Sequence, residues 1–186
     1  MDSKSKWNQK YKQHLTSGKD QKPNPRLEQL SNYLTGGQAI DLACGLGANS
    51  LLLAERKYHV KAYDISEVAI NYLKQQINEG DFHIEPIVCD LTDVRNMKLK
   101  SASCDLVVIS YYLDRSLFPI VKSIIKDNGY FFMETFYSTL EQHPRHIPAQ
   151  YKLGSNELLQ VFNNWKILYY EESEHEGRQT IFCQKA

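Results

Sequence analysis

Short apolar runs alternate with amphipathic segments through the middle of the chain. The runs have the length and composition of buried strands, and the segments between them repeat apolar residues at helical spacing. Pro86 places the third run toward a sheet edge, because proline cannot donate to a strand ladder. The predicted strands are 38–43, 58–64, 83–90, 104–110 and 130–136, and the predicted helices are 48–57, 66–77 and 116–125, the last ended by an Asp-Asn-Gly stop at 127–129.

The N-terminal part has a helical pattern of its own. Trp7, Tyr11 and Leu15 are spaced four residues apart, so they stack on one side of a helix within residues 1–22. This helix either forms a lid over a ligand cleft or packs on the flank of the sheet, and the pattern fits both. An Asn-Pro pair is typical of a helix start and predicts a second helix over 24–34.

The C-terminal part predicts a helix followed by a hairpin. Ser155 has the residue type of an N-cap for a helix that ends near Phe162. Two strand-like segments, 165–173 and 179–185, then flank a short turn, which is typical of an antiparallel pair.

Together these patterns predict an α/β fold in a single domain over residues 1–186. Alternating strands and helices indicate a three-layer sandwich, because right-handed crossovers make the first five strands parallel. With the C-terminal antiparallel hairpin, the expectation is a Rossmann-like, seven-stranded, mostly parallel sheet.

Composition narrows the class of function. Basic and acidic residues number 22 each, which disfavours a nucleic-acid or anionic-lipid partner. No apolar stretch approaches the roughly 20 residues of a membrane span, and the N-terminus lacks a signal-peptide core. The four cysteines sit in or beside apolar segments without a CxxC pair, so we expect free thiols and a cytoplasmic location.

Chemistry-bearing residues gather where the first three predicted strands end. Gly45 and Gly47 follow the first strand and permit a tight turn that a ligand can approach closely. Asp41 lies just before this turn, Asp64 ends the second strand and Asp90 ends the third. Because parallel strands place their carboxyl ends on one edge, the three carboxylates are expected to line a ligand site there.

The stretch "AIDLACGLGANSLLLAERKYHVKAYDIS" resembles motif I and the acidic second-strand motif of class I S-adenosylmethionine-dependent methyltransferases. Further segments, "WNQKY", "YYLDRSLFP", "METF" and "NELLQVFNNWKILYYEE", resemble the small TehB-like (tellurite-resistance type) methyltransferases. One departure is Asn49, which stands where many members have a third glycine.

The resemblance implies S-adenosyl-L-methionine as cofactor and assigns roles to residues of this chain. Asp64 would bind both ribose hydroxyls, and Asp41 would orient the loop and reach toward the methionine amino group. The other implied cofactor contacts are Ala43, Cys44, Gly45 and Gly47 around the methionine part, Ile65, Asp90 and Leu91 around the adenine, and Ser110 near the sulfonium.

Residues after the fourth and fifth strands are expected to meet the methyl acceptor. Tyr111 and Arg115 are the candidates for catalysis, Tyr111 by positioning the acceptor and Arg115 by binding an anionic one. The substrate-binding candidates are Tyr11, Tyr112, His143, Arg145 and His146.

Two other ligand classes fit less well. A dinucleotide fingerprint requires a third glycine three positions after the second, where Ser50 stands, so NAD(P) is disfavoured. The His143-x-x-His146 pair lacks nearby cysteine or further histidine, so no metal site is predicted.

The sequence therefore predicts a cytoplasmic methyltransferase for a small-molecule acceptor, such as an oxyanion or chalcogen compound, as a monomer or homodimer. A protein or nucleic-acid methyltransferase and a non-catalytic S-adenosylmethionine-binding regulator remain open. Strand four ends "ISYYLD" without the N/D-P-P-Y/F signature of amino-methylating enzymes, which counts against DNA adenine, cytosine-N4 or glutamine targets.

Overall fold

The computed structural model describes residues 2–18, 20–78, 80–93, 97–139 and 147–186. The chain forms two compact units, Met1–Leu99 and Lys100–Ala186, which are described in turn. That the two units form the single domain expected from the sequence stays a prediction.

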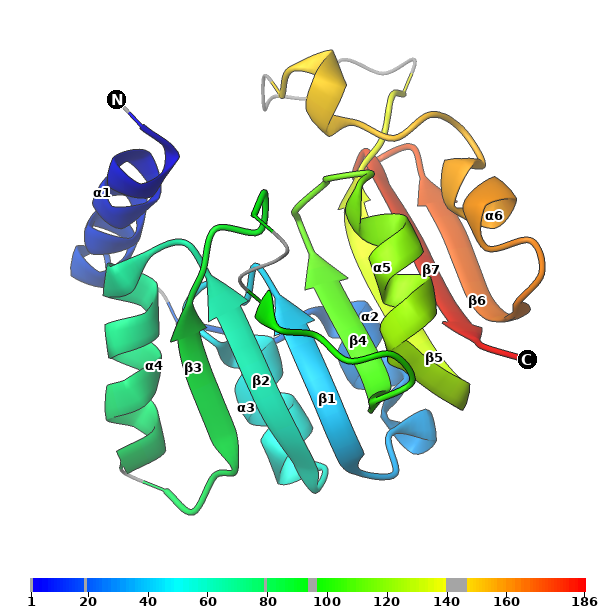
Figure 1. The fold of residues 1–186 in the computed structure, drawn as a ribbon. Helices are drawn as coiled ribbons and strands as arrows, with labels where there is room; N and C mark the ends of the chain where they lie inside the picture. Colours follow the sequence, from blue (N-terminus) through cyan, green and yellow to red (C-terminus); the bar gives the residue numbers. More distant parts are fainter. Residues whose placement is uncertain (1, 19, 79, 94–96, 140–146) are drawn as a thin grey trace. The chain divides into compact units, whose positions relative to one another are not determined.

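The first unit contains three parallel strands and their connecting helices (Figure 1). The strands lie in the order β3-β2-β1, with Ala39 of β1 opposite Val60 of β2 and Val60 opposite Ile84 of β3. The edge position of β3 confirms the expectation drawn from Pro86. The elements are α1 (Ser3–Thr16), α2 (Pro25–Gln29), η1 (Ser31–Tyr33), β1 (Gly37–Leu42), α3 (Ala48–Glu55), β2 (Tyr58–Asp64), α4 (Glu67–Asn78) and β3 (Ile84–Val88).

Helices α3 and α4 share a hydrophobic cluster over β2. Ala62 of β2 packs with Ile70 and Leu73 of α4, and Leu51 of α3 joins the same cluster. The connections β1-α3-β2 and β2-α4-β3 step in the same direction across the strands. Because such connections are right-handed, both helices lie on the same face of these three strands. This packing holds the loops after β1 and β2 close together.

Helix α2 begins as predicted but ends early. The Asn24 side chain accepts hydrogen bonds from the backbone N–H groups of Arg26 and Leu27, and Pro25 occupies the first turn. The α-helix stops at Gln29, and the chain continues as a 3₁₀ turn over 31–33 rather than as one helix to residue 34.

The second unit contains four strands in the order β4-β5-β7-β6. Strands β4 and β5 are parallel, whereas β7 runs antiparallel to both β5 and β6, which confirms the predicted hairpin. Its core includes the fully buried rings of Phe131, Phe162 and Phe182. The elements are β4 (Cys104–Ser110), α5 (Leu117–Ile124), β5 (Ile125–Phe136), η3 (Ala149–Tyr151), α6 (Glu157–Val161), β6 (Lys166–Ser173) and β7 (Arg178–Gln184).

The expected Asp-Asn-Gly stop between helix and strand is wrong. Strand β5 starts at Ile125, directly after α5, and residues 127–129 lie inside it. Asn128 adopts a left-handed φ of 64°, and the register shifts so that Cys104 pairs Ile125 while Leu106 pairs Tyr130. The turn-forming residues therefore make a bulge within the strand.

The predicted cap of the last helix is also shifted. Asn156, in the left-handed region, occupies the N-cap position of α6. Ser155 instead donates from its hydroxyl to Oε2 of Glu172 at 3.0 Å. The carboxylate competes with the helix end for this hydroxyl, which sequence spacing does not reveal.

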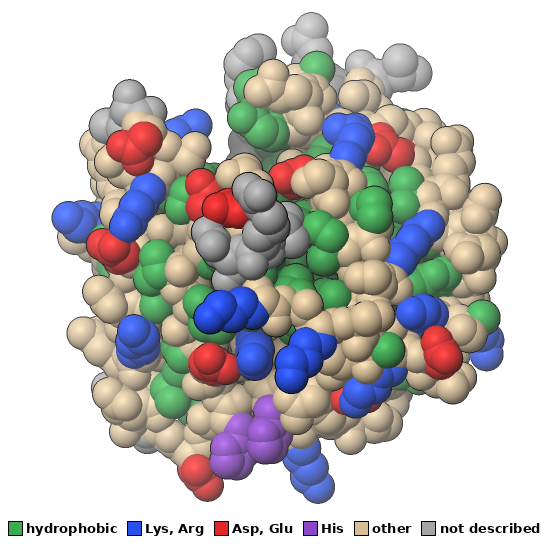
Figure 2. All heavy atoms as spheres, in the orientation of Figure 1, with side chains coloured by type: hydrophobic (Ala, Val, Ile, Leu, Met, Phe, Trp, Pro, Cys, Tyr) green, Lys and Arg blue, Asp and Glu red, His purple; other side chains and the backbone are tan. Residues whose placement is uncertain are grey.

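The parallel strands of the first unit and the parallel pair and antiparallel hairpin of the second confirm the predicted α/β class, mostly parallel with a C-terminal antiparallel hairpin. All four cysteines are free, as expected. No helix among the described residues is long and apolar enough to cross a membrane. Basic and acidic side chains lie next to one another on the face drawn in Figure 2.

Candidate active site

The glycine turn after β1 is built from left-handed backbone. Ala43, Gly45 and Gly47 have φ values of 57°, 57° and 88°. The N–H of Gly47 donates to the carbonyl of Cys44 at 3.0 Å, and the N–H of Cys44 donates to the carbonyl of Tyr63 at 2.9 Å. The turn is therefore closed on itself and tied to the end of β2.

The two glycines have different neighbours. A β-carbon at Gly47 would lie 2.4 Å from Cδ1 of Leu73, so a side chain there would collide with the core side of α4. A β-carbon at Gly45 would lie 2.9 Å from the Tyr11 hydroxyl oxygen. Gly47 is thus required for helix packing, and Gly45 for the close approach of a polar group.

Asp64 joins the turn to the end of β2. Its Oδ2 accepts from the N–H of Gly45 at 2.9 Å and its Oδ1 from the N–H of Ser66 at 2.8 Å. Burial raises the pKa of this carboxyl, and these backbone hydrogen bonds act in the opposite direction. A carboxylate held rigidly by two N–H groups is suited to accept from a ligand diol.

Asp41 is buried on the neighbouring strand. Its Oδ2 accepts from the Ser50 hydroxyl at 2.6 Å, whereas its Oδ1 has no hydrogen-bond partner among the described residues. Burial, with a smaller effect from the charge of Asp64, raises the pKa of Asp41 to about 7. An orphaned buried carboxylate oxygen fits a cationic group such as an α-ammonium.

The predicted adenine contacts occupy more open positions. Asp90 is exposed, and its Oδ1 accepts from both the N–H and the hydroxyl of Thr92, at 3.0 and 2.7 Å. Ile65, next to Asp64, is half-buried, and Leu91 is buried. The first unit therefore brings together Asp41, the glycine turn, Asp64 and Ile65.

Asn49 has a structural explanation. Its Oδ1 accepts from the N–H of Asn24 at 2.8 Å, while the Asn24 side chain caps α2. A glycine in its place would leave that buried backbone donor without this acceptor. The departure from the common methyltransferase motif therefore anchors the segment that precedes β1.

Tyr11 lies in the first unit beside the predicted cofactor residues. Its ring stacks on Trp7 with centroids 5.7 Å apart. Burial, and after it the charge of Asp64, raises the pKa of the Tyr11 hydroxyl, and a hydrogen bond from this hydroxyl acts to lower the pKa of Asp64, which burial raises. The structure thus places Tyr11 at the carboxylate assigned to the ribose, and substrate binding by Tyr11 stays a prediction.

In the second unit, Tyr111 follows β4 in a left-handed conformation with φ 59°. Its backbone N–H donates to the carbonyl of Glu134 at 2.8 Å, and its hydroxyl donates to Oε1 of Glu134 at 2.8 Å. Such strain in a non-glycine residue requires strong local support and recurs at functional sites.

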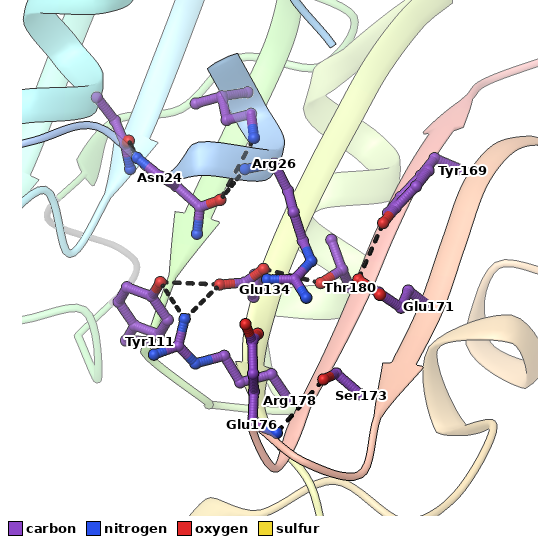
Figure 3. Close-up of polar contacts among 12 residues, drawn as sticks. Asn24, Arg26, Tyr111, Glu134, Tyr169, Glu171, Ser173, Glu176, Arg178 and Thr180 are labelled. Carbon is purple, nitrogen blue, oxygen red and sulfur yellow. Dashed lines mark hydrogen bonds and ion pairs between the residues drawn. The ribbon is translucent and has the colours of Figure 1, made fainter. Parts of the chain in front are cut away.

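A polar cluster surrounds the buried carboxylate of Glu134 (Figure 3). Thr180 donates from its hydroxyl to Oε2 at 2.9 Å, and Nη1 of Arg178 lies 3.3 Å from Oε1 and 3.0 Å from the Tyr111 hydroxyl oxygen. The Arg178 guanidinium also covers the Tyr111 ring, 4.8 Å from its centroid. Tyr111 is therefore locked between a carboxylate and a cation.

Glu134 and Arg178 were missed as site candidates. A carboxylate inside an aromatic strand is the same signal that pointed to Asp41, and it was available for Glu134 in "YFFMETF". Arg178 carried no comparable signal, because it follows an ordinary hairpin glycine.

Arg115 is engaged with protein groups. Its Nε and Nη2 donate to the two carboxylate oxygens of Glu157 at 2.6 and 2.9 Å, and Nη2 also donates to the carbonyl of Lys152 at 3.0 Å. This bidentate pair supports a role in holding the segment before α6, and acceptor binding by Arg115 stays a prediction. Ser110 and Tyr112 are half-buried, and His143, Arg145 and His146 lie outside the described residues.

Comparison with known families gives a match over most of the chain. The sequence model of the family described as "Tellurite resistance protein TehB" matches residues 8–181. Over 147 residues the chain is 26% identical to the "Probable S-adenosyl-L-methionine-dependent methyltransferase TehB" of Haemophilus influenzae, covering 77% of this chain and 51% of that protein. The chain thus spans about half the length of this curated relative.

Solved structures share the fold. The crystal structure of TehB from Haemophilus influenzae matches with a TM-score of 0.75 and 21% identity, over 88% of this chain and 63% of that one. A geranyl diphosphate C-methyltransferase from Streptomyces coelicolor, in complex with Mg²⁺, geranyl diphosphate and S-adenosyl-L-homocysteine, matches with a TM-score of 0.69 and 15% identity, over 87% and 80%.

Proposed function

Because the chain belongs to the family described as tellurite resistance protein TehB, we propose that it is a methyltransferase that uses S-adenosylmethionine and acts on a small molecule. The observation that carries the proposal is the pair of acids at the glycine turn. Asp64 holds the N–H of Gly45, and Asp41 keeps one buried oxygen without a partner among the described residues.

These residues suit different parts of one nucleoside cofactor. Asp64 would accept from the ribose hydroxyls, Asp41 Oδ1 would face the methionine ammonium, and Ile65 would pack against the adenine. Asp90 and Leu91 are assigned to the far edge of the adenine. When bound, S-adenosylmethionine supplies an electrophilic methyl group on its sulfonium.

The Glu134 cluster is our candidate for the acceptor side. Glu134 accepts hydrogen bonds from the Tyr111 hydroxyl and the Arg178 guanidinium and so holds both groups in place. An acceptor would therefore meet polar groups whose positions are already set. Methyl transfer depends chiefly on alignment of the nucleophile with the methyl carbon. A base is needed only where the acceptor loses a proton during attack.

A small acceptor is supported by the balanced charge of the chain, since nucleic-acid partners call for a basic surface. A cytoplasmic location and a monomeric or homodimeric state remain part of this proposal. Tellurite and selenite are reasonable first acceptors, because the family description names tellurite.

The test is formation of S-adenosylhomocysteine by the full chain with tellurite, selenite and simple thiols. We expect turnover with at least one of them, and cofactor binding weaker by about tenfold or more in Asp64→Ala. Asp81→Ala, which removes an exposed acid of the same unit, is the matched control. Cofactor binding without turnover would favour a non-catalytic regulator, and turnover only with protein or nucleic acid would overturn the small-molecule assignment.

A further inference from the structure

The Asp64 carboxylate has a limited capacity to accept hydrogen bonds. An ionised carboxylate offers about four lone-pair sites. The backbone N–H groups of Gly45 and Ser66 occupy one on each oxygen. The remaining capacity is what a ribose diol needs for two hydrogen bonds.

The Tyr11 hydroxyl uses part of that remaining capacity, because it donates a hydrogen bond to Asp64. It sits beside the Asp64 carboxylate and over the turn, 2.9 Å from the place that a β-carbon of Gly45 would take. The Asp64 side chain is buried in this arrangement. A ribose therefore cannot reach Asp64 fully while Tyr11 remains there.

Helix α1 is attached to the segment around Ser66 and the start of α4 by polar contacts of Asn8 and Lys4. Oδ1 of Asn8 accepts from the Ser66 hydroxyl at 2.7 Å and from the N–H of Val68 at 3.3 Å. Lys4 pairs with Glu67 through exposed side chains, a kind of ion pair that stabilises little. No residue of α1 is fully buried, so the helix belongs to the low-stability end of the fold.

The helix does not depend on this docking for its own start. Asp2 caps it, accepting from the N–H of Ser5 at 2.8 Å. Undocking therefore breaks the contacts of Asn8, Tyr11 and Lys4 while leaving the helix cap intact.

We propose that Tyr11 and the cofactor ribose compete for Asp64, which makes α1 a latch that opens when S-adenosylmethionine binds. The inference rests on the proposed cofactor role of Asp64. Cofactor entry then includes the cost of undocking α1, and the contacts of α1 tune affinity without touching the methyl group.

Binding of S-adenosylmethionine to the full chain, measured by calorimetry, tests the competition. Tyr11→Phe removes the competing hydroxyl and should lower the dissociation constant about threefold or more. Asn8→Ala keeps that hydroxyl but weakens the docking, and should shift affinity in the same direction. Tyr151→Phe, at an exposed tyrosine of the second unit, is the matched control and should leave affinity unchanged.

Hydrogen exchange of the unmodified chain gives a second readout. Saturating S-adenosylmethionine should speed exchange of the amides in 3–16 and slow exchange in 41–47. Slower exchange in α1, or equal or weaker binding by Tyr11→Phe, would overturn the latch. If Asp64→Ala binds as tightly as the unmodified chain, the proposed cofactor site fails instead, so the two failures are distinguishable.

Discussion

The backbone N–H of Gly45 donates a 2.9 Å hydrogen bond to Oδ2 of Asp64. The glycine turn after β1 and the acid that ends β2 are therefore one physical unit. A change at either residue alters the geometry of both, because the carboxylate is the acceptor that holds the turn.

Replacing Asp64 with alanine should weaken S-adenosylmethionine binding by about tenfold or more, because the ribose would lose a charged acceptor. The variant should also lose about 1–3 kcal/mol of stability, since the buried N–H groups of Gly45 and Ser66 lose their acceptor. Calorimetric titration and urea denaturation measure the two effects. Unchanged affinity in a folded variant would contradict the site.

Asp41 should make stability depend on pH. Its pKa in the folded chain is about 7, above the ordinary value of 3.8, because burial penalises the charge. The folded state then binds more protons than the unfolded state between these values, so this contribution is present below pH 4 and is lost as pH rises toward 7. Thermal melting of the unmodified chain and Asp41→Asn at pH 5 and pH 8 measures it.

In Asp41→Asn the side chain cannot ionise, so the difference in melting temperature between the two pH values should shrink. The Asp64 pKa is raised as well, so a smaller residual dependence of the same sign is expected. An undiminished dependence in Asp41→Asn would assign the effect to other groups.

Glu134 should be among the most sensitive positions of the second unit. Glu134→Ala would leave Tyr111, Thr180 and Arg178 without their shared buried acceptor and should cost about 3–5 kcal/mol in urea denaturation. The matched control is Glu85→Ala, which breaks an exposed pair with Lys61 and should change stability by about 1 kcal/mol or less. Equal effects at the two positions would refute the assigned difference.

Restoring the common glycine at position 49 should destabilise this chain. Asn49→Gly removes the acceptor of the Asn24 N–H and adds backbone freedom in α3, for a combined loss of about 1–3 kcal/mol. Asn49→Asp keeps an oxygen in the same place and should retain most of the stability. Guanidinium denaturation compares them, and an unchanged midpoint in Asn49→Gly would show that the contact contributes nothing.

The sequence predicts helices and strands correctly where residues that are neighbours along the chain decide the secondary structure. The Asn-Pro start of α2, the edge strand with Pro86 and the buried run of β4 were predicted because caps, prolines and apolar periodicity act locally. The start of β5 was mispredicted, because pairing with β4 overrides the turn preference of residues 127–129.

The candidate site likewise has features that the sequence predicts and features that depend on tertiary packing. By itself the sequence determined that acids and glycines follow consecutive strands, since side-chain order along each strand and the sense of the crossovers follow from chain geometry. Only the tertiary structure decided that Tyr11 lies at Asp64, that Arg115 pairs with Glu157 and that Glu134 gathers Tyr111, Thr180 and Arg178. These partners are distant along the chain, and packing, rather than any local pattern, selects which polar groups meet.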